Sequence, residues 1–342
     1  MATGISIDRT KWLREEVTLE TRDAVDLQIG PRTTPKDLEK LERTVAHPLT
    51  GPVYVKGAQP GDLLEIEYVD IRPERYGWTR FSPGFGFLPD LFDYFFVAHW
   101  DITPEYATSP QLPGVRIPNG AFMGTAGVAP SREQLRIWSE REKALADRGG
   151  KVMLPTAAAA VPGQGPVAEE GLRTIPPREN CGNADVKQLT RGSKLFVPVA
   201  VDGALYSVGD GHYAQGDGES CGTAIEMGAT AVVRFRIHKD VARTKGIVWP
   251  RFSHAGYDNR LERSFIATMG MPVTAEGRQE DADLTLAARN AVIRMIELLE
   301  ERGWSREQAY VICSVAVDLR VSNAVDVPNV TVSALLPEAI FE

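Results

Sequence analysis

Hydrophobic and polar residues alternate over many short stretches of the chain, which is the pattern of β-strands that turn one face to water. In residues 63–71, for example, Leu64 and Ile66 alternate with Glu65 and Glu67. The 31 glycines and 23 prolines are spread between such stretches and predict frequent turns. We expect further strands at residues 53–55, 194–201, 204–208, 224–226, 231–237, 315–321 and 330–336.

Helical periodicity is confined to fewer segments. The clearest helix is predicted over residues 283–302, where Ala291, Met295 and Leu299 recur at helical spacing and Gly303 follows as a stop. Residues 305–308, Ser-Arg-Glu-Gln, form a capping box for a second helix. Strands along the whole chain, with the main helices late, predict an α+β protein dominated by β structure. Further helices are expected near residues 34–41 and 131–148.

Two segments interrupt this pattern. Residues 72–120 are rich in Gly, Pro and aromatic residues, which line either a core or interface or the wall of a substrate pocket. Residues 149–172 are rich in Ala, Pro and Gly without periodicity, which indicates a long, lid-like loop. We therefore divide the chain into an N-terminal β-rich part, residues 1–172, and a C-terminal α+β part, residues 173–342, and expect both to form one compact unit.

Composition narrows the class of protein. The net charge of −8 argues against a nucleic-acid surface. The sequence contains no uninterrupted run of 18 apolar residues, so we expect no membrane span. The three cysteines include no CxxC pair, so neither a disulfide framework nor a cysteine-built zinc site is expected. The first residues lack the pattern of a secretory signal. We expect a soluble, cytoplasmic protein.

The densest polar segment is residues 209–219, Gly-Asp-Gly-His-Tyr-Ala-Gln-Gly-Asp-Gly-Glu. Asp210 and His212 stand two residues apart at the end of a predicted strand, so their side chains point to the same side. They are candidate metal ligands, or alternatively a structural hydrogen-bonded pair. Glu219 is a candidate ligand, general base or turn carboxylate, and Asp217 is typical of a turn.

Other candidates lie outside that segment. Asn183 and Asp185 stand in a second glycine turn with the same mixture of amides and a carboxylate. Cys221 is either a nucleophile or, in our preferred interpretation, a small buried hydrophobic residue. His47 precedes a proline, and taken alone it is interpreted as a structural residue.

These candidates lie in stretches that resemble the acetamidase/formamidase family. The resemblance runs in order along almost the whole chain. It implies a β-sandwich-like core with attached α/β elements, a homo-oligomer (dimer or higher), and hydrolysis of a carboxamide to a carboxylate and ammonia or an amine. The main stretches are His47-Pro-Leu-Thr-Gly-Pro-Val-Tyr-Val55, Pro176-Pro-Arg-Glu-Asn-Cys-Gly-Asn-Ala-Asp185, Gly203-Ala-Leu-Tyr-Ser-Val-Gly-Asp210, Gln215-Gly-Asp-Gly-Glu219 and Thr223-Ala-Ile-Glu226.

The resemblance also implies a metal-dependent site. Carried over onto this sequence, it makes Asp185, Asp210 and His212 the expected ligands, with His47 as a further candidate. Glu219 becomes the expected general base. The expected ion is divalent, zinc in the first place and calcium or another divalent ion as the alternative.

In that mechanism a metal polarises the amide carbonyl and activates water, while a carboxylate moves a proton from the water to the leaving nitrogen. Asn183 and Gln215 are expected to donate hydrogen bonds to the amide or its intermediate. The expected partner is a small amide. The aromatic segment at residues 76–100 departs from the family pattern and suits a substrate bulkier than formamide or acetamide.

Three rival hypotheses stay open at this point. The first is a cysteine hydrolase that uses Cys221 with Glu219. The second keeps the site and changes the bond to a carbamate, a cyclic imide or a lactam. The third is a β-rich binding protein in which the same loop holds only a structural cation.

Overall fold

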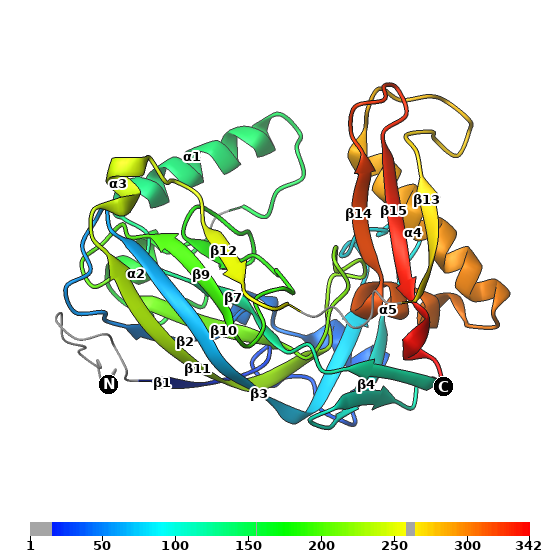
Figure 1. The fold of residues 1–342 in the computed structure, drawn as a ribbon, viewed down its shortest axis with the longest axis horizontal. Coiled ribbons are helices and arrows are strands. Elements are labelled where there is room, and N and C mark those ends of the chain that lie inside the picture. The colour runs from blue at the N-terminus through cyan, green and yellow to red at the C-terminus, as the bar shows by residue number, and fades with distance from the viewer. Residues whose placement is uncertain (1–15, 155, 258–263) are drawn as a thin grey trace.

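One large antiparallel sheet dominates the molecule (Figure 1). The structure is a computed structural model that describes residues 16–154, 156–257 and 264–342. Within these residues the sheet has twelve strands, with the central order β6-β5-β4-β3-β11-β10-β7-β8. Strand β1 pairs with β11, β2 with β10, β9 with β3 and β12 with β9. The strands are β1 Val17–Thr21, β2 Leu49–Val53, β3 Leu63–Phe81, β4 Phe96–Ile102, β5 Tyr106–Ser109, β6 Leu112–Pro118, β7 Phe122–Gly127, β8 Cys181–Asn183, β9 Ser193–Pro198, β10 Tyr206–His212, β11 Glu226–His238 and β12 Arg251–His254.

A separate C-terminal unit, residues 264–342, stands beside the large sheet (Figure 1). Its small sheet has the order β13-β15-β14, and helices α4 and α5 pack against it. The predicted α+β class with dominant β structure is confirmed. Strands from both sides of residue 172 enter the large sheet, and the division of the chain at that residue stays a prediction. The elements of this unit are β13 Phe265–Gly270, α4 Leu284–Glu301, α5 Arg306–Ala316, β14 Asp318–Asn323, β15 Thr331–Pro337 and the 3-10 helix η4 Glu338–Ile340.

The predicted helices form where their caps indicated. Ser305 and Gln308 make the expected capping box at the start of α5, and Asp283 caps α4 through a hydrogen bond from the Leu286 amide. The segment after Thr34 is a short 3-10 helix, η1, of six residues, or two turns, and not an α-helix. The other helices are η1 Pro35–Lys40, η2 Arg43–Val45, α1 Arg132–Asp147, α2 Pro166–Glu170 and α3 Val241–Lys245.

Several predicted boundaries were wrong. Helix α5 continues through Ala316, and β14 begins only at Asp318, because a short buried apolar run does not distinguish helix from strand. The strand predicted at residues 53–55 lies earlier, at Leu49–Val53, and the one predicted at residues 224–226 begins at Glu226. The predicted loop at residues 149–172 contains the short helix α2.

Strand β3 does not follow the simple alternation of buried and exposed side chains that its sequence predicts. Its first half pairs with β9 and its second half with β4, while β11 follows it along nearly its whole length. Glu65, expected on a wetter face, is buried and pairs with Lys194 Nζ and His238 Nε2, each at 2.6 Å. A buried carboxylate needs such partners, since desolvating a charge is costly.

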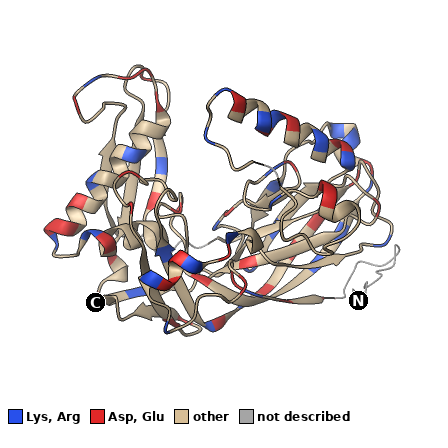
Figure 2. Ribbon diagram, turned by 180° about the vertical axis from the view of Figure 1, so that it is seen from behind, with Lys and Arg blue, Asp and Glu red and all other residues tan. Residues whose placement is uncertain are grey.

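Charged side chains concentrate on the helices, as Figure 2 shows for α1 and α4, while the strands are mostly uncharged. The inner face of α4 is apolar and fully buried, through residues that include Ala291, Met295 and Leu299. In the described part of the chain, no helix combines the length and the apolar character that a membrane crossing requires.

Candidate active site

Strand β10 holds the two residues on which the candidate site is built. The predicted strand at residues 204–208 extends as far as His212, so Asp210 and His212 both lie within β10 rather than in a loop after it. Strand β10 pairs with β7 on one side and with β11 on the other. This register places His212 opposite Glu226 of β11 and opposite Phe122 of β7. Residues far apart in sequence are thereby brought to one point.

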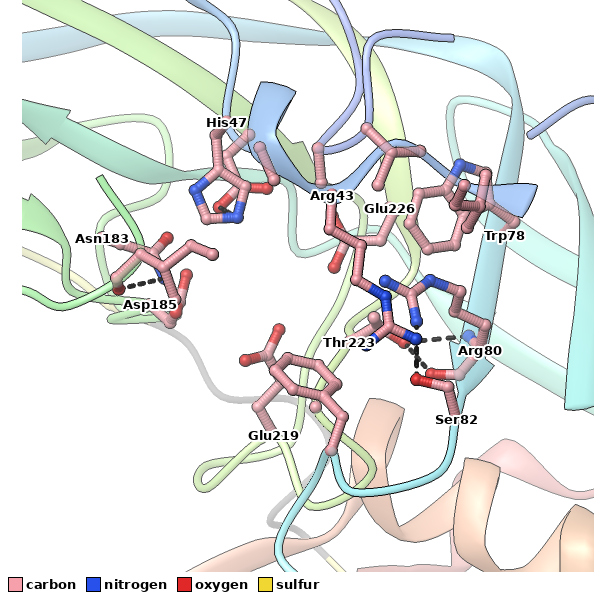
Figure 3. A pocket seen from close by; sticks show the side chains of 18 of the residues that line it. Arg43, His47, Trp78, Arg80, Ser82, Asn183, Asp185, Glu219, Thr223 and Glu226 are labelled. Carbon is pink, nitrogen blue, oxygen red and sulfur yellow. Dashed lines mark hydrogen bonds and ion pairs between the residues drawn. The ribbon is translucent and has the colours of Figure 1, made fainter. Parts of the chain in front are cut away.

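A cavity of about 130 Å³ opens beside these strands (Figure 3). Figure 3 shows His47, Asn183 and Asp185 on one side of the cavity, with Arg80 and Trp78 on the other. The cavity is therefore acidic at one end and basic and aromatic at the other. Its lining residues are Ala24, Val25, Leu41, Glu42, Arg43, Ala46, His47, Trp78, Arg80, Ser82, Phe85, Met153, Arg173, Ile175, Asn183, Asp185, Asp210, His212, Glu219, Gly222, Thr223 and Glu226.

Four buried polar atoms in the acidic end have no hydrogen-bond partner among the described residues: Asp185 Oδ1, Asp210 Oδ1, His212 Nε2 and Glu226 Oε2. His212 Nε2 lies 3.1 Å from Glu226 Oε2 and 3.4 Å from Asp210 Oδ1, but neither contact has the alignment of a hydrogen bond. Ligand atoms of Asp210, His212 and Glu226 lie within 4.8 Å of one another, as do those of Asp185, His212 and Glu219. Such convergence of unpartnered buried groups calls for a ligand or an ion.

Gly124 of β7 provides the space between these groups. A Cβ at this position would lie 2.6 Å from Asp185 Oδ1, 2.8 Å from Asp210 Oδ2 and 2.8 Å from His212 Cε1. Contacts that short are not tolerated, so any residue other than glycine would push the three side chains apart. The absence of a side chain at Gly124 is therefore a condition for the cluster.

Gln215 fixes the orientation of the His212 ring. Its Nε2 donates to the backbone carbonyl of Asp185 at 2.9 Å, which leaves Oε1 facing His212 Nδ1 at 3.0 Å. Because Oε1 can only accept, Nδ1 carries the proton, and in the neutral ring Nε2 holds the lone pair. Gln215 does not line the cavity, and both its Nε2 and its Oε1 have a partner in the protein; its donation to the substrate stays a prediction.

Thr125, His47 and Asn183 border the cluster. Thr125 Oγ1 lies 2.5 Å from Asn183 Oδ1, 3.1 Å from Asp210 Oδ2 and 3.5 Å from His47 Nδ1. His47 Nε2 is 3.9 Å from Asp210 Oδ2, at the margin of the cluster. Asn183 Nδ2 donates to the Ile175 carbonyl at 3.1 Å and keeps a second N–H. The structure thus brings the predicted His47 and Asn183 to the same place as the predicted acids.

The pKa values in the cluster are strongly displaced. Burial and the charges of Asp210 and Glu226 raise the pKa of Asp185 to about 8. Burial, together with Asp185, raises the pKa of Glu219 well above its usual value, and burial also raises the pKa of Glu226. Burial lowers the pKa of His212, but the Glu226 and Asp210 carboxylates outweigh it and raise that pKa overall. Crowded carboxylates of this kind favour a bound cation or shared protons.

Three of these acidic residues have left-handed backbone conformations. The φ angles are 48° at Asp185, 58° at Asp210 and 43° at Glu219. Non-glycine residues seldom adopt this region, and each instance costs on the order of 1 kcal/mol or more. The positions of these side chains therefore require a strained backbone, as is common at functional sites.

The structure also shows the surroundings of three other predicted features, which are Cys221, Asp217 and the aromatic segment. Cys221 is fully buried, does not line the cavity, and burial raises the pKa of its thiol to about 11, as fits a small hydrophobic residue. Asp217 lies in a turn, and both its carboxylate oxygens are 3.2 Å from Gln188 Nε2. Within the aromatic segment, Trp78 and Phe85 line the cavity, whereas Phe92 packs in the core.

Sequence reasoning assigned no role to Glu226, Gly124 or Arg80. Glu226 ends the stretch 223–226 that carried part of the family resemblance, so a signal for it existed. Gly124 begins a further stretch that resembles the family, Gly124-Thr-Ala-Gly-Val-Ala-Pro130, so a signal existed for it too. Arg80 gave no local signal, because its importance comes from what lies across the strands from it.

The chain is similar to known proteins along most of its length. The acetamidase/formamidase family model matches residues 7–342. An acetamidase from Mycolicibacterium smegmatis is 37% identical over 324 residues, which cover 87% of this chain and 80% of that protein. A formamidase from Methylophilus methylotrophus is 35% identical over 348 residues, which cover 96% and 85%. Among solved structures, a gamma lactamase from Delftia acidovorans superposes with a TM-score of 0.90 at 35% identity and covers 96% of this chain and 85% of that chain.

These similarities extend across both the large sheet and the C-terminal unit, so they are not limited to one motif. They confirm the predicted enzyme class, a hydrolase that acts on linear amides. The chain belongs to the acetamidase/formamidase family.

Proposed function

We propose that this protein hydrolyses the C–N bond of a small carboxamide at a divalent-metal centre in the acidic end of the cavity. The observation that carries this proposal is the convergence of four unpartnered buried atoms on Asp185, Asp210, His212 and Glu226. Buried polar atoms are nearly always satisfied in folded proteins, so a group of four around one space indicates a missing partner of positive charge.

The donor set favours zinc over calcium. An imidazole nitrogen with several carboxylates suits a borderline ion such as zinc, whereas calcium takes oxygen ligands alone. Gln215 holds His212 with the Nε2 lone pair directed away from it, which is the arrangement found behind metal-binding histidines. In our proposal, Asp185, Asp210, His212 and Glu226 hold the ion. His47, at the margin of the cluster, is a further candidate.

A bound divalent ion supplies Lewis-acid polarisation of the amide carbonyl and makes water more acidic. The Glu219 carboxylate faces the cavity, and its raised pKa suits a general base that keeps the water's proton and later donates it. As the C–O bond forms and the C–N bond breaks, Glu219 passes this proton to the leaving nitrogen, which departs as ammonia or an amine. In our proposal, the second N–H of Asn183 Nδ2, which does not donate to the Ile175 carbonyl, binds the substrate oxygen.

Formamide-like and acetamide-like amides are the first candidate substrates, supported by the names of the two sequence relatives. The cavity is also walled by Trp78, Phe85 and Val25, which leaves room for an amide with a longer chain. A lactam is the second candidate, supported by the similarity to the gamma lactamase. A panel of formamide, acetamide, longer amides and a lactam, assayed for ammonia or ring opening, ranks them.

Metal analysis of Gly124→Ala tests the proposed centre. We expect the native protein to carry about one zinc per chain, and the variant to lose both the zinc and at least about 10²-fold in kcat/KM, because the new methyl group fills the space between the ligands. Gly120→Ala is the matched control, since a Cβ there meets nothing closer than the Tyr213 carbonyl at 4.0 Å. Full activity of chelator-stripped protein with no metal by elemental analysis would exclude the metal mechanism.

Two rival hypotheses make opposite predictions. A cysteine hydrolase would lose activity in Cys221→Ala, whereas we expect turnover to continue because the thiol lies outside the cavity. A non-catalytic binding protein with a structural cation would hydrolyse no amide on the panel, in native form or as a variant. The same panel therefore tests both.

We also propose that the protein is a cytoplasmic homo-oligomer. All three cysteines are free and buried, which suits a reducing compartment. The outer face of β13 exposes Phe265 and Met269, at 51% and 62% of their surfaces, and these apolar side chains suit contact with a second copy. Light scattering should find a dimer or larger species, and Met269→Lys should weaken it. A monomer at all concentrations would exclude the oligomer.

A further inference from the structure

The basic end of the cavity contains a buried cation that the proposed mechanism does not use. Arg80 is 9% exposed and lines the cavity from β3. Its Nη1 donates to Ser82 Oγ at 3.1 Å, while its buried Nε has no hydrogen-bond partner among the described residues. Among the residues that the structure describes, Arg80 forms no ion pair with a carboxylate, and its guanidinium carbon lies 5.9 Å from the ring centres of Trp78 and of Phe85. A buried cation without a counter-ion is unfavourable by several kcal/mol.

A second arginine adds to this positive charge. Arg43 extends from η2 into the same space, and Figure 3 shows its guanidinium beside that of Arg80. Burial lowers the pKa of Arg80, and the charge of Arg43 lowers it further, which shows that the two cations repel each other. The acid next to Arg43 in sequence, Glu42, directs its carboxylate to the Thr44 amide and hydroxyl at 2.9 and 2.7 Å.

Two adjacent guanidinium groups with free N–H donors form a receptor for a carboxylate, which arginine binds through paired hydrogen bonds. The apolar part of the cavity lining includes Trp78, which Figure 3 shows beside Arg80, together with Phe85 and Val25, and such a lining suits a short methylene chain. An engineered cavity of about 150 Å³ holds benzene, which has six heavy atoms, so a cavity of about 130 Å³ favours the shortest members of a substrate class.

We propose that Arg80, assisted by Arg43, binds a carboxylate on the substrate, so that the preferred substrates are short monoamides of dicarboxylic acids. The amide group lies at the acidic cluster and the carboxylate at the arginines. This inference rests on the proposed amide hydrolysis and names its substrate class. Malonamate and succinamate are short members of the class, with one and two methylene groups between the amide and the carboxylate.

Another role for Arg80 is to balance the carboxylates of the acidic cluster. Among these, Glu226 has the strongest influence on Arg80. That role would make Arg80 equally important for charged and for neutral substrates. The two roles therefore predict different ratios of kcat/KM between a charged and a neutral substrate, whereas both predict an overall loss of activity.

A matched pair of substrates measures this ratio. Succinamate and 4-oxopentanamide have the same number of heavy atoms, but a methyl ketone replaces the carboxylate in the second. We expect kcat/KM of the native enzyme to favour succinamate by about 10²-fold, and Arg80→Met to bring the ratio close to one. Arg136→Met, on the exposed face of α1, is the control and should leave the ratio unchanged.

A second variant keeps the test valid if Arg80→Met folds poorly. Arg43 is exposed, so Arg43→Gln leaves the core intact and should lower the ratio about 3- to 10-fold. A ratio near one in the native enzyme, or an equal loss for both substrates in Arg80→Met, would overturn the carboxylate site while amide hydrolysis stands. Failure to hydrolyse any amide would overturn the proposed function and the substrate class together.

Discussion

Strand β10 of the large sheet and helix α5 of the C-terminal unit both bury polar side chains, but with different results. In α5 the Tyr310 hydroxyl donates to the Ser220 carbonyl at 2.5 Å, and Ser314 Oγ donates to the Thr223 carbonyl at 2.7 Å. In β10, Asp210 Oδ1 and His212 Nε2 find no such partner among the described residues. The helix satisfies its polar groups and stabilises the fold, whereas the strand leaves its polar groups available for a ligand.

This difference carries a physical lesson. A buried polar group without a partner costs about 1–3 kcal/mol, and more if it is charged, so the acidic cluster must be held by a stable surround. The described contacts show where that support comes from, because both hydrogen bonds of α5 end on the loop that carries Glu219. We therefore expect substitutions in the cluster to change activity more than stability, and substitutions in the C-terminal unit to do the reverse.

The largest effect is expected from Glu219→Gln. Loss of the proposed base should lower kcat/KM by about 10²- to 10⁴-fold. The melting temperature should stay the same or rise, because one of several crowded carboxylates is removed. Steady-state kinetics and calorimetry measure both. Asp217→Asn, in the same loop but paired with Gln188, should keep turnover within a few-fold; equal losses in the two variants would remove the distinction.

Met295→Ala tests the opposite case. Met295 is fully buried on α4, and its truncation should lower the free energy of unfolding by about 2–5 kcal/mol through lost burial and a cavity. Activity per folded molecule should be unchanged well below the melting temperature. Met271→Ala, at a position that is 43% exposed, should change stability by less than about 0.5 kcal/mol. A loss of kcat at full folding in Met295→Ala would contradict the separation of the two regions.

Tyr310→Phe tests the hydrogen bond that joins helix α5 to the loop carrying Glu219. The substitution leaves the Ser220 carbonyl and the Leu88 amide without their partner, which should cost about 1–3 kcal/mol of stability. Because Ser220 follows Glu219, kcat should also fall a few-fold. Urea unfolding and kinetics measure the two effects. Tyr94 is 36% exposed, and among the described residues its hydroxyl donates to Glu307 alone, so Tyr94→Phe should change neither quantity. An effect as large as that of Tyr310→Phe would refute the link.

The smallest effect concerns a carboxylate of the large sheet that is fully paired. Burial raises the pKa of Glu65, but hydrogen bonds from Lys194 and His238 outweigh it and lower that pKa below its usual value. Glu65 therefore adds stability, about 1 kcal/mol, that is present above its usual pKa of about 4.3 and is lost as the pH falls through the lowered value. In urea unfolding between pH 7 and pH 3, Glu65→Gln should be less stable than the native protein at pH 7, and the gap should close in acid. A constant gap would show that the ion pairs are not the cause.

Local patterns were sufficient for many features of this protein. The capping box at Ser305 and Gln308 and the apolar face of α4 depend on residues three or four apart, so the sequence specifies them directly. The spacing of Asp210 and His212 placed both on one side of a strand, and they do meet. The clustered motifs likewise indicated Asn183, Asp185 and Glu219, all of which line the cavity.

Only the tertiary structure decided the rest. Glu226 joins the cluster because β11 pairs with β10 in a register that sets it opposite His212. Gly124 matters because three side chains from β10 and from the turn after β8 fill the space where its Cβ would be. Arg80 becomes notable because its buried Nε has no hydrogen-bond partner among the described residues. These relations join residues that are distant in sequence, and cross-strand register and burial are settled by the packing of the whole sheet, so no local pattern contains them.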